Sequence, residues 1–327
     1  MLQSIMVPLD GSALAEHALP AAVTLARGTG AALHLVRVHD PLAANADGHH
    51  FAEVDDAVRA EEQHYIQHVV GRVGAAGVAA RGSIAEGPPA PALHRYAVQR
   101  GIDLIVMATH GRTGVSRAWL GSVADAVMRR SSVPVLMVRP GDDVVDLRRG
   151  RTFSGILVPL DGSSHAEAVL EPAIALAETL GATVTLLEVV PPVYAVPQPL
   201  GYSWTATPAD QERMETRTEM AEDYLRGVAE RLRAAHPGVE VRTEVRVFDH
   251  TATGILDRAH SLDFDLVAMT TQGRGASRVL MGSIADKVLR GTALPLLILR
   301  PFVEAREGEA LAPEVAEHYG GVAGRRV

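Results

Sequence analysis

A glycine-rich segment that leads into a helix is the part of this sequence whose residue types most directly predict chemistry. It extends from Gly111 to Gly121, and an apolar run with helical spacing follows it. Glycines let a backbone approach an anion closely, and the N–H groups and partial positive charge of a helix N-terminus attract phosphate. Ser122 adds a hydroxyl donor, and Arg112 and Arg117 are the nearest cations. The segment therefore predicts a polyphosphate site, although its spacing is not that of a P-loop.

A second candidate for ligand contact is the carboxylate of Asp10, which comes directly after a short apolar run. At the end of a strand, a carboxylate can contact a ligand, coordinate a metal ion or cap the following helix. These alternatives stay open on the sequence alone. Ser12 is predicted to cap a helix that extends through Ala26, because its hydroxyl can accept from unpaired N–H groups of the first turn.

Three histidines have positions that invite a chemical role. His110 lies beside the glycine-rich segment, but its counterpart in the repeat described below is Gln272, which cannot transfer protons at neutral pH. We therefore interpret His110 as an exposed loop residue. His64 and His68 have the spacing of paired metal ligands on a helix. Because no third ligand is in sight, a solvated helix face is the better interpretation.

Composition excludes several classes of function. The net charge is −8, and Lys287 is the only lysine, so the chain lacks the basic face that nucleic acid requires. Cysteine is absent, which removes disulfides, thiolate metal sites and thiol nucleophiles. No run approaches the roughly 20 apolar residues of a membrane span, and the N-terminus does not resemble a signal peptide. We expect a soluble cytoplasmic protein with no membrane partner.

The chain is an internal repeat. Four blocks recur in the same order: residues 7–12 return at 158–163, 103–107 at 265–269, 121–125 at 282–286, and 134–140 at 295–301. A polar stretch without periodicity separates the two copies. We predict one domain over 1–141, a second over 153–302, and a loosely ordered tail over 303–327.

Each copy alternates between short apolar runs and helical periods. In the first copy these predict strands over 5–9, 31–38, 78–84, 104–108 and 133–138, and helices over 12–26, 51–73, 89–99 and 121–130. Continuously apolar strands indicate a parallel sheet covered on both faces. The expected fold is α/β, with two tandem Rossmann-like, doubly wound, five-stranded sheets ordered 3-2-1-4-5. The strand order reverses between the first and fourth strands, which is where such sheets bind ligands.

The last strand of each copy, over 133–138 and 294–299, is apolar and would form a sheet edge. An unpaired apolar edge is an association hazard. We expect the two edges to pair with each other and form a pseudo-dimer within the chain; a homodimer is a further possibility.

The glycine-rich segment gives the chain a specific resemblance to the universal stress protein family. Nucleotide-binding members have Gly-x2-Gly-x9-Gly-Ser/Thr at this strand-to-helix junction. Here Gly111 is followed by nine residues and then Gly121-Ser122, while Ala108 replaces the family's first glycine. The resemblance covers nearly the whole chain apart from the tail, as two tandem copies.

The resemblance implies binding of an adenine nucleotide, with ATP, alone or with Mg²⁺, as the first candidate. It implies that Asp10 contacts the nucleoside, that Pro8 and Val38 flank the adenine, and that Met107 lies nearby. Gly111, Gly121, Ser122 and Val123 would hold the phosphates. The complete first site is expected to comprise Pro8, Asp10, Val38, Met107, Ala108, Gly111, Arg112, Gly114, Arg117, Gly121, Ser122 and Val123.

The second copy departs further from the family pattern, and we rank its site behind the first. Gly273 and Gly282 enclose eight residues rather than nine, and Thr270 replaces the first glycine. Its β-branched side chain would crowd the phosphate path. The matching positions in this copy are Pro159, Asp161, Val189, Met269, Gly273, Gly282, Ser283 and Ile284.

Three functions fit these observations. The leading one is a nucleotide-responsive binding protein of the stress response, in which the ligand biases two conformations. The second is a slow ATPase or nucleotidyl transferase, although the sequence offers no convergent carboxylate pair and no fixed lysine or arginine. The third is an adaptor that binds no ligand and acts through its surfaces.

Overall fold

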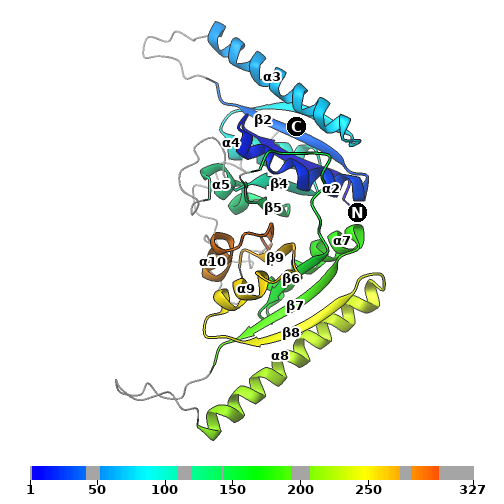
Figure 1. Ribbon diagram of the computed structural model, residues 1–327. Helices are drawn as coiled ribbons and strands as arrows, with labels where there is room; N and C mark the ends of the chain where they lie inside the picture. Colours follow the sequence, from blue (N-terminus) through cyan, green and yellow to red (C-terminus); the bar gives the residue numbers. More distant parts are fainter. Residues whose placement is uncertain are drawn as a thin grey trace, which may run out of the picture.

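The computed structural model describes residues 2–41, 52–109, 120–141, 143–192, 207–272 and 281–301. Within them, ten strands form one sheet in the order β3-β2-β1-β4-β5-β10-β9-β6-β7-β8, covered by helices (Figure 1). Elements of the first copy are β1 (Ser4–Leu9), α1 (Ala13–Glu16), α2 (Leu19–Thr29), β2 (Ala32–His39), α3 (Ala52–Ala75), β3 (Ala80–Glu86), α4 (Pro89–Gln99), β4 (Leu104–Ala108), α5 (Ser122–Arg130) and β5 (Val135–Val138).

The second copy repeats the same succession of elements. It comprises β6 (Gly155–Leu160), α6 (Ser164–Glu167), α7 (Leu170–Leu180), β7 (Thr183–Val190), α8 (Pro208–Ala235), β8 (Val241–Val247), α9 (Thr251–Ala259), β9 (Leu266–Thr270), α10 (Ser283–Gly291) and β10 (Leu296–Leu299). The predicted tail over 303–327 lies outside the described residues.

The predicted α/β class and strand order are confirmed in both copies. Within each copy the strands pair in parallel in the order 3-2-1-4-5. The two five-stranded sheets are halves of one continuous sheet, because β5 and β10 pair antiparallel, with Leu136 opposite Leu297. The expected pairing of the two last strands is therefore present.

One predicted helix boundary is wrong. The helix expected from Ser12 through Ala26 is divided into α1 and α2 by the turn at His17 and Ala18. The cap itself is as expected, since Ser12 Oγ accepts a hydrogen bond from the N–H of Ala15 at 3.2 Å. Pro20 follows at the start of α2, where a missing N–H costs nothing.

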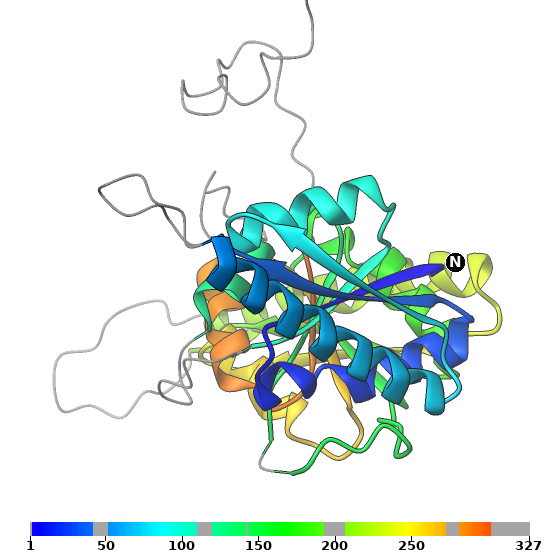
Figure 2. The ribbon, with the colours of Figure 1, turned by 90° about the horizontal axis from the view of Figure 1, so that it is seen from above.

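Two hydrophobic cores lie on the two faces of the sheet, and each extends through both copies. One core contains residues of α2, α3, α7 and α8, and the other contains residues of α4, α5, α9 and α10. Successive strand residues alternate between them, so Ile5 and Val7 belong to the first core and Met6 to the second. Figure 2 shows α3 and α4 on opposite sides of the strands of the first copy.

Contacts beyond β5 and β10 also join the two copies. α2 packs beside α7 (Figure 1), where a Cβ on Gly28 would lie 2.9 Å from Thr179 Cγ2. The connecting segment is anchored to α2, because the N–H of Arg151 donates to Thr24 Oγ1 at 2.9 Å. The copies thus share both hydrophobic cores and one sheet, and the segment that connects them is anchored to α2.

The first copy buries a neutral hydrogen-bonded triad between the sheet and α4. His34 is 2% exposed, and its Nδ1 lies 3.0 Å from the hydroxyl of Tyr96. That hydroxyl also lies 3.0 Å from Ser83 Oγ. Burial, and to a smaller extent the charges of Arg81 and Arg100, lowers the pKa of His34 from 6.5 to about 4.

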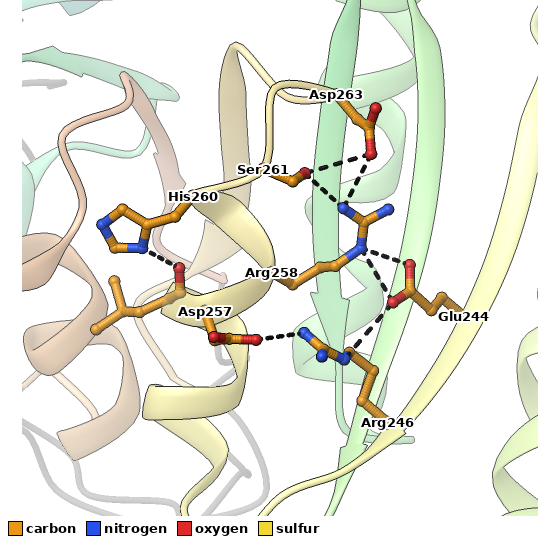
Figure 3. A network of polar contacts seen from close by, with 8 residues as sticks. Glu244, Arg246, Asp257, Arg258, His260, Ser261 and Asp263 are labelled. Atoms are coloured by element: carbon orange, nitrogen blue, oxygen red, sulfur yellow. Dashed lines mark hydrogen bonds and ion pairs between the residues drawn. The ribbon is translucent and has the colours of Figure 1, made fainter.

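The second copy fills the same place with an ionic network. Thr185, Glu244 and Arg258 occupy the positions that match His34, Ser83 and Tyr96 in the repeat. Arg258 Nε donates to both carboxylate oxygens of Glu244, at 2.7 and 3.0 Å (Figure 3). Its guanidinium carbon lies 4.5 Å from the ring centroid of Phe264. The fold therefore tolerates either neutral or charged residues at these positions.

A pair of glycine substitutions tests the packing of α3 on β3. A Cβ on Gly82 would lie 2.2 Å from Ile66 Cγ2, so Gly82→Ala should lower the free energy of unfolding by about 1–3 kcal/mol through overpacking. Gly71 lies in α3, and a Cβ added to it would meet nothing within 4 Å, so Gly71→Ala should raise that free energy by about 0.5–1 kcal/mol. Urea unfolding measures both; equal effects of the two variants would contradict this packing.

The low pKa of His34 predicts an acid-sensitive contribution to stability. The unfolded chain binds a proton at His34 below pH 6.5, whereas the folded chain does so only near pH 4. The contribution is therefore complete above pH 6.5 and is lost as the pH falls towards 4, by about 3 kcal/mol in total.

His34→Thr places the residue of the second copy at this position and serves as the matched variant. We expect it to be less stable at pH 7.5 but to lose less stability than the wild type between pH 6.5 and 4.5. Parallel pH profiles of the unfolding free energy in the two proteins would contradict the assignment.

Candidate functional site

The Asp–Gly–Ser turns at the carboxyl ends of β1 and β6 have the same geometry. Asp10 Oδ1 accepts from Ser12 N at 2.9 Å and from Ser12 Oγ at 2.6 Å. Asp161 Oδ1 accepts from Ser163 N at 3.0 Å and Oγ at 2.6 Å. The intervening glycines have φ of +81° and +78°, which L side chains rarely adopt. Each carboxylate is thereby fixed at a strand end, half-buried and at the position where the strand order reverses.

The helices that follow β4 and β9 both begin after a glycine. Gly121 is the N-cap of α5, and its N–H donates to Thr109 O at 2.8 Å. Gly282 is the N-cap of α10, and its N–H donates to Thr271 O at 2.7 Å. No side chain of the described residues caps either helix. The N–H groups of the first turn are therefore available to an anion.

The second copy has a cavity of about 900 Å³ at these strand ends. It is bordered by β6, β7, β9 and the N-terminus of α10, with α8 along one side. Of the eight positions predicted for this copy, seven line it: Pro159, Asp161, Val189, Met269, Gly282, Ser283 and Ile284. The eighth, Gly273, lies outside the described residues.

Thr270 also lines this cavity, but its side chain is held by the backbone. It is buried, and its hydroxyl donates to Gln272 O at 2.6 Å. We expected Thr270 to crowd the phosphates. This expectation stays a prediction, because it depends on the segment 273–280, which the structure does not describe.

The described residues of the first predicted site occupy the matching positions. Pro8, Asp10, Val38, Gly121 and Val123 are half-buried, and Ser122 is exposed. Met107 and Ala108 are buried at the end of β4. The remaining predicted residues, Gly111, Arg112, Gly114 and Arg117, lie outside the described residues, as does His110.

Sequence analysis missed a buried charged cluster between β2 and α3. Arg37 Nη2 lies 2.8 Å from Glu62 Oε1. His39 contacts Glu62 through Nδ1 at 2.9 Å and Asp55 through Nε2 at 3.2 Å. Arg37, His39 and Glu62 are each less than 10% exposed. The sequence did contain a signal for this cluster. Arg37 and His39 are two residues apart in an apolar strand, so both lie on the same face and both need a polar partner there.

A second array, present in both copies, ties the long helix to α1 or α6. Glu16 accepts from Tyr65 Oη at 3.1 Å and from Arg72 Nη1 at 2.6 Å. Glu167 accepts from Tyr224 Oη at 3.0 Å and from Arg231 Nη2 at 2.7 Å. The array fixes the alignment of α3 with α8, since each tyrosine precedes its arginine by the same interval.

These tyrosines remain protonated at neutral pH. Burial raises the pKa of Tyr65, and the carboxylates of Glu16 and Asp10 raise it further. Burial likewise raises the pKa of Tyr224, together with Glu167, Glu188 and Asp161. Each tyrosine therefore acts as a hydrogen-bond donor beside the strand-end carboxylate.

Neither a metal cluster nor a membrane-spanning helix is found within the described ranges. There, no group of three or more histidine and acidic side chains is arranged to hold a metal ion. His64 and His68 lie on an exposed face of α3. Over the same residues, no helix combines the length and apolarity needed to cross a membrane.

Comparison with known proteins gives consistent matches. The model of the universal stress protein family matches residues 1–139 and 152–300. A universal stress protein of Methanocaldococcus jannaschii is 31% identical over 142 residues, covering 42% of this chain and 83% of that protein. One of Mycobacterium tuberculosis is 28% identical over 199 residues, covering 61% of this chain and 62% of that relative. The crystal structure of a universal stress protein from Archaeoglobus fulgidus superposes with a TM-score of 0.62 at 18% identity, covering 91% of this chain and 98% of that one.

Proposed function

The chain belongs to the universal stress protein family, and on that premise we propose that it binds an adenine nucleotide, ATP first, at the carboxyl ends of its strands. The cavity of about 900 Å³ in the second copy is the observation that carries this proposal. Its size is within the range of small-molecule sites, which are mostly apolar with a few fixed polar groups. The apolar part of its lining includes Val189, Met269 and Ile284, and the polar part includes Asp161 and Ser283.

The two ends of this cavity suit the two ends of a nucleotide. The N-terminus of α10, which has no side-chain cap, would bind phosphates through its N–H groups and Ser283. Any Mg²⁺ would be coordinated by those phosphates. The strand ends near Pro159 and Val189 would hold the base. We propose the same assignment for the matching residues of the first copy, where α5 also begins at a glycine.

The sequence ranked the first copy ahead of the second, and the glycine-rich segments that motivated this ranking, 110–119 and 273–280, are not among the described residues. We propose that each copy, over 1–141 and 153–302, is one nucleotide-binding domain. Paired through β5 and β10, the copies would act as a pseudo-dimer within one cytoplasmic chain.

Ligand-dependent conformation is the proposed output of binding. A nucleotide that binds two states of the strand-end loops unequally shifts the balance between them. In that way the protein would contribute to a stress response. Homodimerisation is a further proposal, for which the sheet edges β3 and β8 remain within the described chain.

Mass spectrometry of small molecules released from the freshly purified, denatured protein tests the proposal directly. We expect an adenine nucleotide at up to one equivalent per copy, restored by added ATP after the protein has been stripped. A chain that neither retains nor binds any nucleotide, with or without Mg²⁺, would refute nucleotide binding and favour the adaptor function.

Substitutions at the two helix N-caps assign the sites. Gly282→Asp should lower ATP affinity of the second copy at least tenfold, because the carboxylate would cap α10 itself and repel phosphate. Gly121→Asp should do the same in the first copy. The N-cap φ values of −58° and −60° suit any residue, and the gain from a new cap offsets the close approach of a Cβ at 282 to Thr271 O, so the melting temperature should change little.

Asparagine at the same positions is the matched control. A Cβ at residue 282 lies 3.2 Å from Thr271 O in either variant, and Asn caps without charge. Isothermal titration should therefore show a smaller loss for Gly282→Asn than for Gly282→Asp. Full binding stoichiometry in the Gly121→Asp, Gly282→Asp double variant would place the nucleotide elsewhere.

A further inference from the structure

The two copies differ where the second strand meets the long helix. β2 and β7 align through the repeat, and α3 and α8 align through their matched Tyr and Arg contacts with Glu16 and Glu167. In this alignment the cluster residues Arg37, His39 and Glu62 correspond to Glu188, Val190 and Ala221.

In the first copy, charged side chains occupy the space between the end of β2 and α3. Arg37 and His39 extend from β2 to Glu62, and Asp55 closes the cluster from the N-terminal part of α3. The three inner side chains are buried and paired with one another. A ligand at the end of β2 could therefore not extend under α3 without breaking an ion pair, which is costly when one partner is left buried.

In the second copy the same place is part of the cavity. Valine and alanine replace the histidine and the glutamate, and Glu188, Val190, Ala221 and Tyr224 all line the cavity wall. Arg217 lines it from α8, and its Nη1 donates to Pro191 O at 3.1 Å. We call this region the α8 subsite, defined by Glu188, Val190, Arg217, Ala221 and Tyr224.

The side chains of the α8 subsite favour one kind of ligand group. The hydroxyl of Tyr224 donates to Glu167, and Arg217 contacts the backbone of Pro191. Glu188 brings a half-buried carboxylate to the wall next to the apolar Val190 and Ala221, whereas Arg217 is exposed at the side of α8. An ionised carboxylate only accepts hydrogen bonds, so it favours a hydroxyl or amino group and disfavours a carbonyl or phosphate.

We propose that the second copy has a ligand subsite under α8 that the first copy has closed, and that Glu188 selects there a hydrogen-bond donor of the bound nucleotide. This inference rests on the proposed function. The donor is a ribose hydroxyl or the amino group of adenine, and in either case Glu188 determines specificity in the second copy alone. The two copies of one chain would then bind nucleotides with different selectivity.

Isothermal titration of the full chain in a Gly121→Asp background isolates the second copy. The ligands are ATP, 2′-deoxyATP, which lacks the ribose hydroxyl, and ITP, which has a carbonyl in place of the amino group. Glu188→Gln should lower ATP affinity about tenfold, as expected for a hydrogen bond to a charged group. If a ribose hydroxyl is the donor, Glu188→Gln should also reduce the ratio of the affinities for ATP and 2′-deoxyATP. If the amino group of adenine is the donor, the variant should instead reduce the ratio of the affinities for ATP and ITP.

Glu171→Gln is the matched control, because it removes an exposed carboxylate at the start of α7, away from the cavity. It should leave all three affinities unchanged. A second variant, Glu188→Arg with Ala221→Glu, introduces the ion pair of the first copy and should close the subsite. The second copy should then still bind ATP but lose the ligand preference that Glu188 gives it, and so take on the selectivity of the first copy.

The outcomes separate the two claims. Affinities for the three ligands that are the same in the parent, in Glu188→Gln and in the double substitution would overturn the subsite and leave the proposed function standing. Absence of ATP binding in the wild-type chain would overturn both.

Discussion

A parallel sheet covered by helices on both faces confines polar chemistry to the ends of its strands. Every residue of β4 and of β9 is buried, and the backbone groups of these strands are paired with their neighbours. A side chain that must meet solvent or a ligand therefore lies in the last residues of a strand or just after it. Asp10 and Asp161 do so, each held by the serine two residues on. The position of the candidate site follows from this burial.

Polar residues inside the sheet are subject to the same constraint, because each of them is buried and needs a partner from the helix that covers it. His34 and Arg37 lie within β2, on opposite faces, and each contacts a polar residue of the helix that covers it. Tyr96 of α4 serves the first and Glu62 of α3 the second. Because a buried polar group without a partner is costly, such residues can change only together with their partners. The second copy shows both clusters replaced as sets.

Duplication has given this chain two versions of one architecture with different interiors. The neutral triad of His34 corresponds to the ionic network of Arg258, and the cluster around Glu62 corresponds to the open wall around Ala221. The elements that carry the fold are unchanged: the strand order, the Asp–Gly–Ser turns, and the tyrosine–glutamate–arginine array. Packing against a shared sheet permits the interiors to diverge, since the hydrogen bonds and ion pairs described above for each cluster join residues of one copy.

The sequence by itself determined what depends on local pattern. Apolar runs and the four recurring blocks predicted the strands, their order within each copy, and the Ser12 cap, because these follow from periodicity and from hydrogen bonds between near neighbours. It also predicted that the two last strands would pair. The site positions were chosen by the reversal of strand order and by resemblance, and their ligand remains a proposal.

Only the tertiary structure decided how the copies combine and where space remains. The fusion into one ten-stranded sheet depends on antiparallel register between β5 and β10. The cluster of Arg37, His39 and Glu62 and the cavity of the second copy depend on how helices pack on the sheet. These contacts join residues distant along the chain. Their geometry is set by packing of side-chain volumes, which no local pattern records.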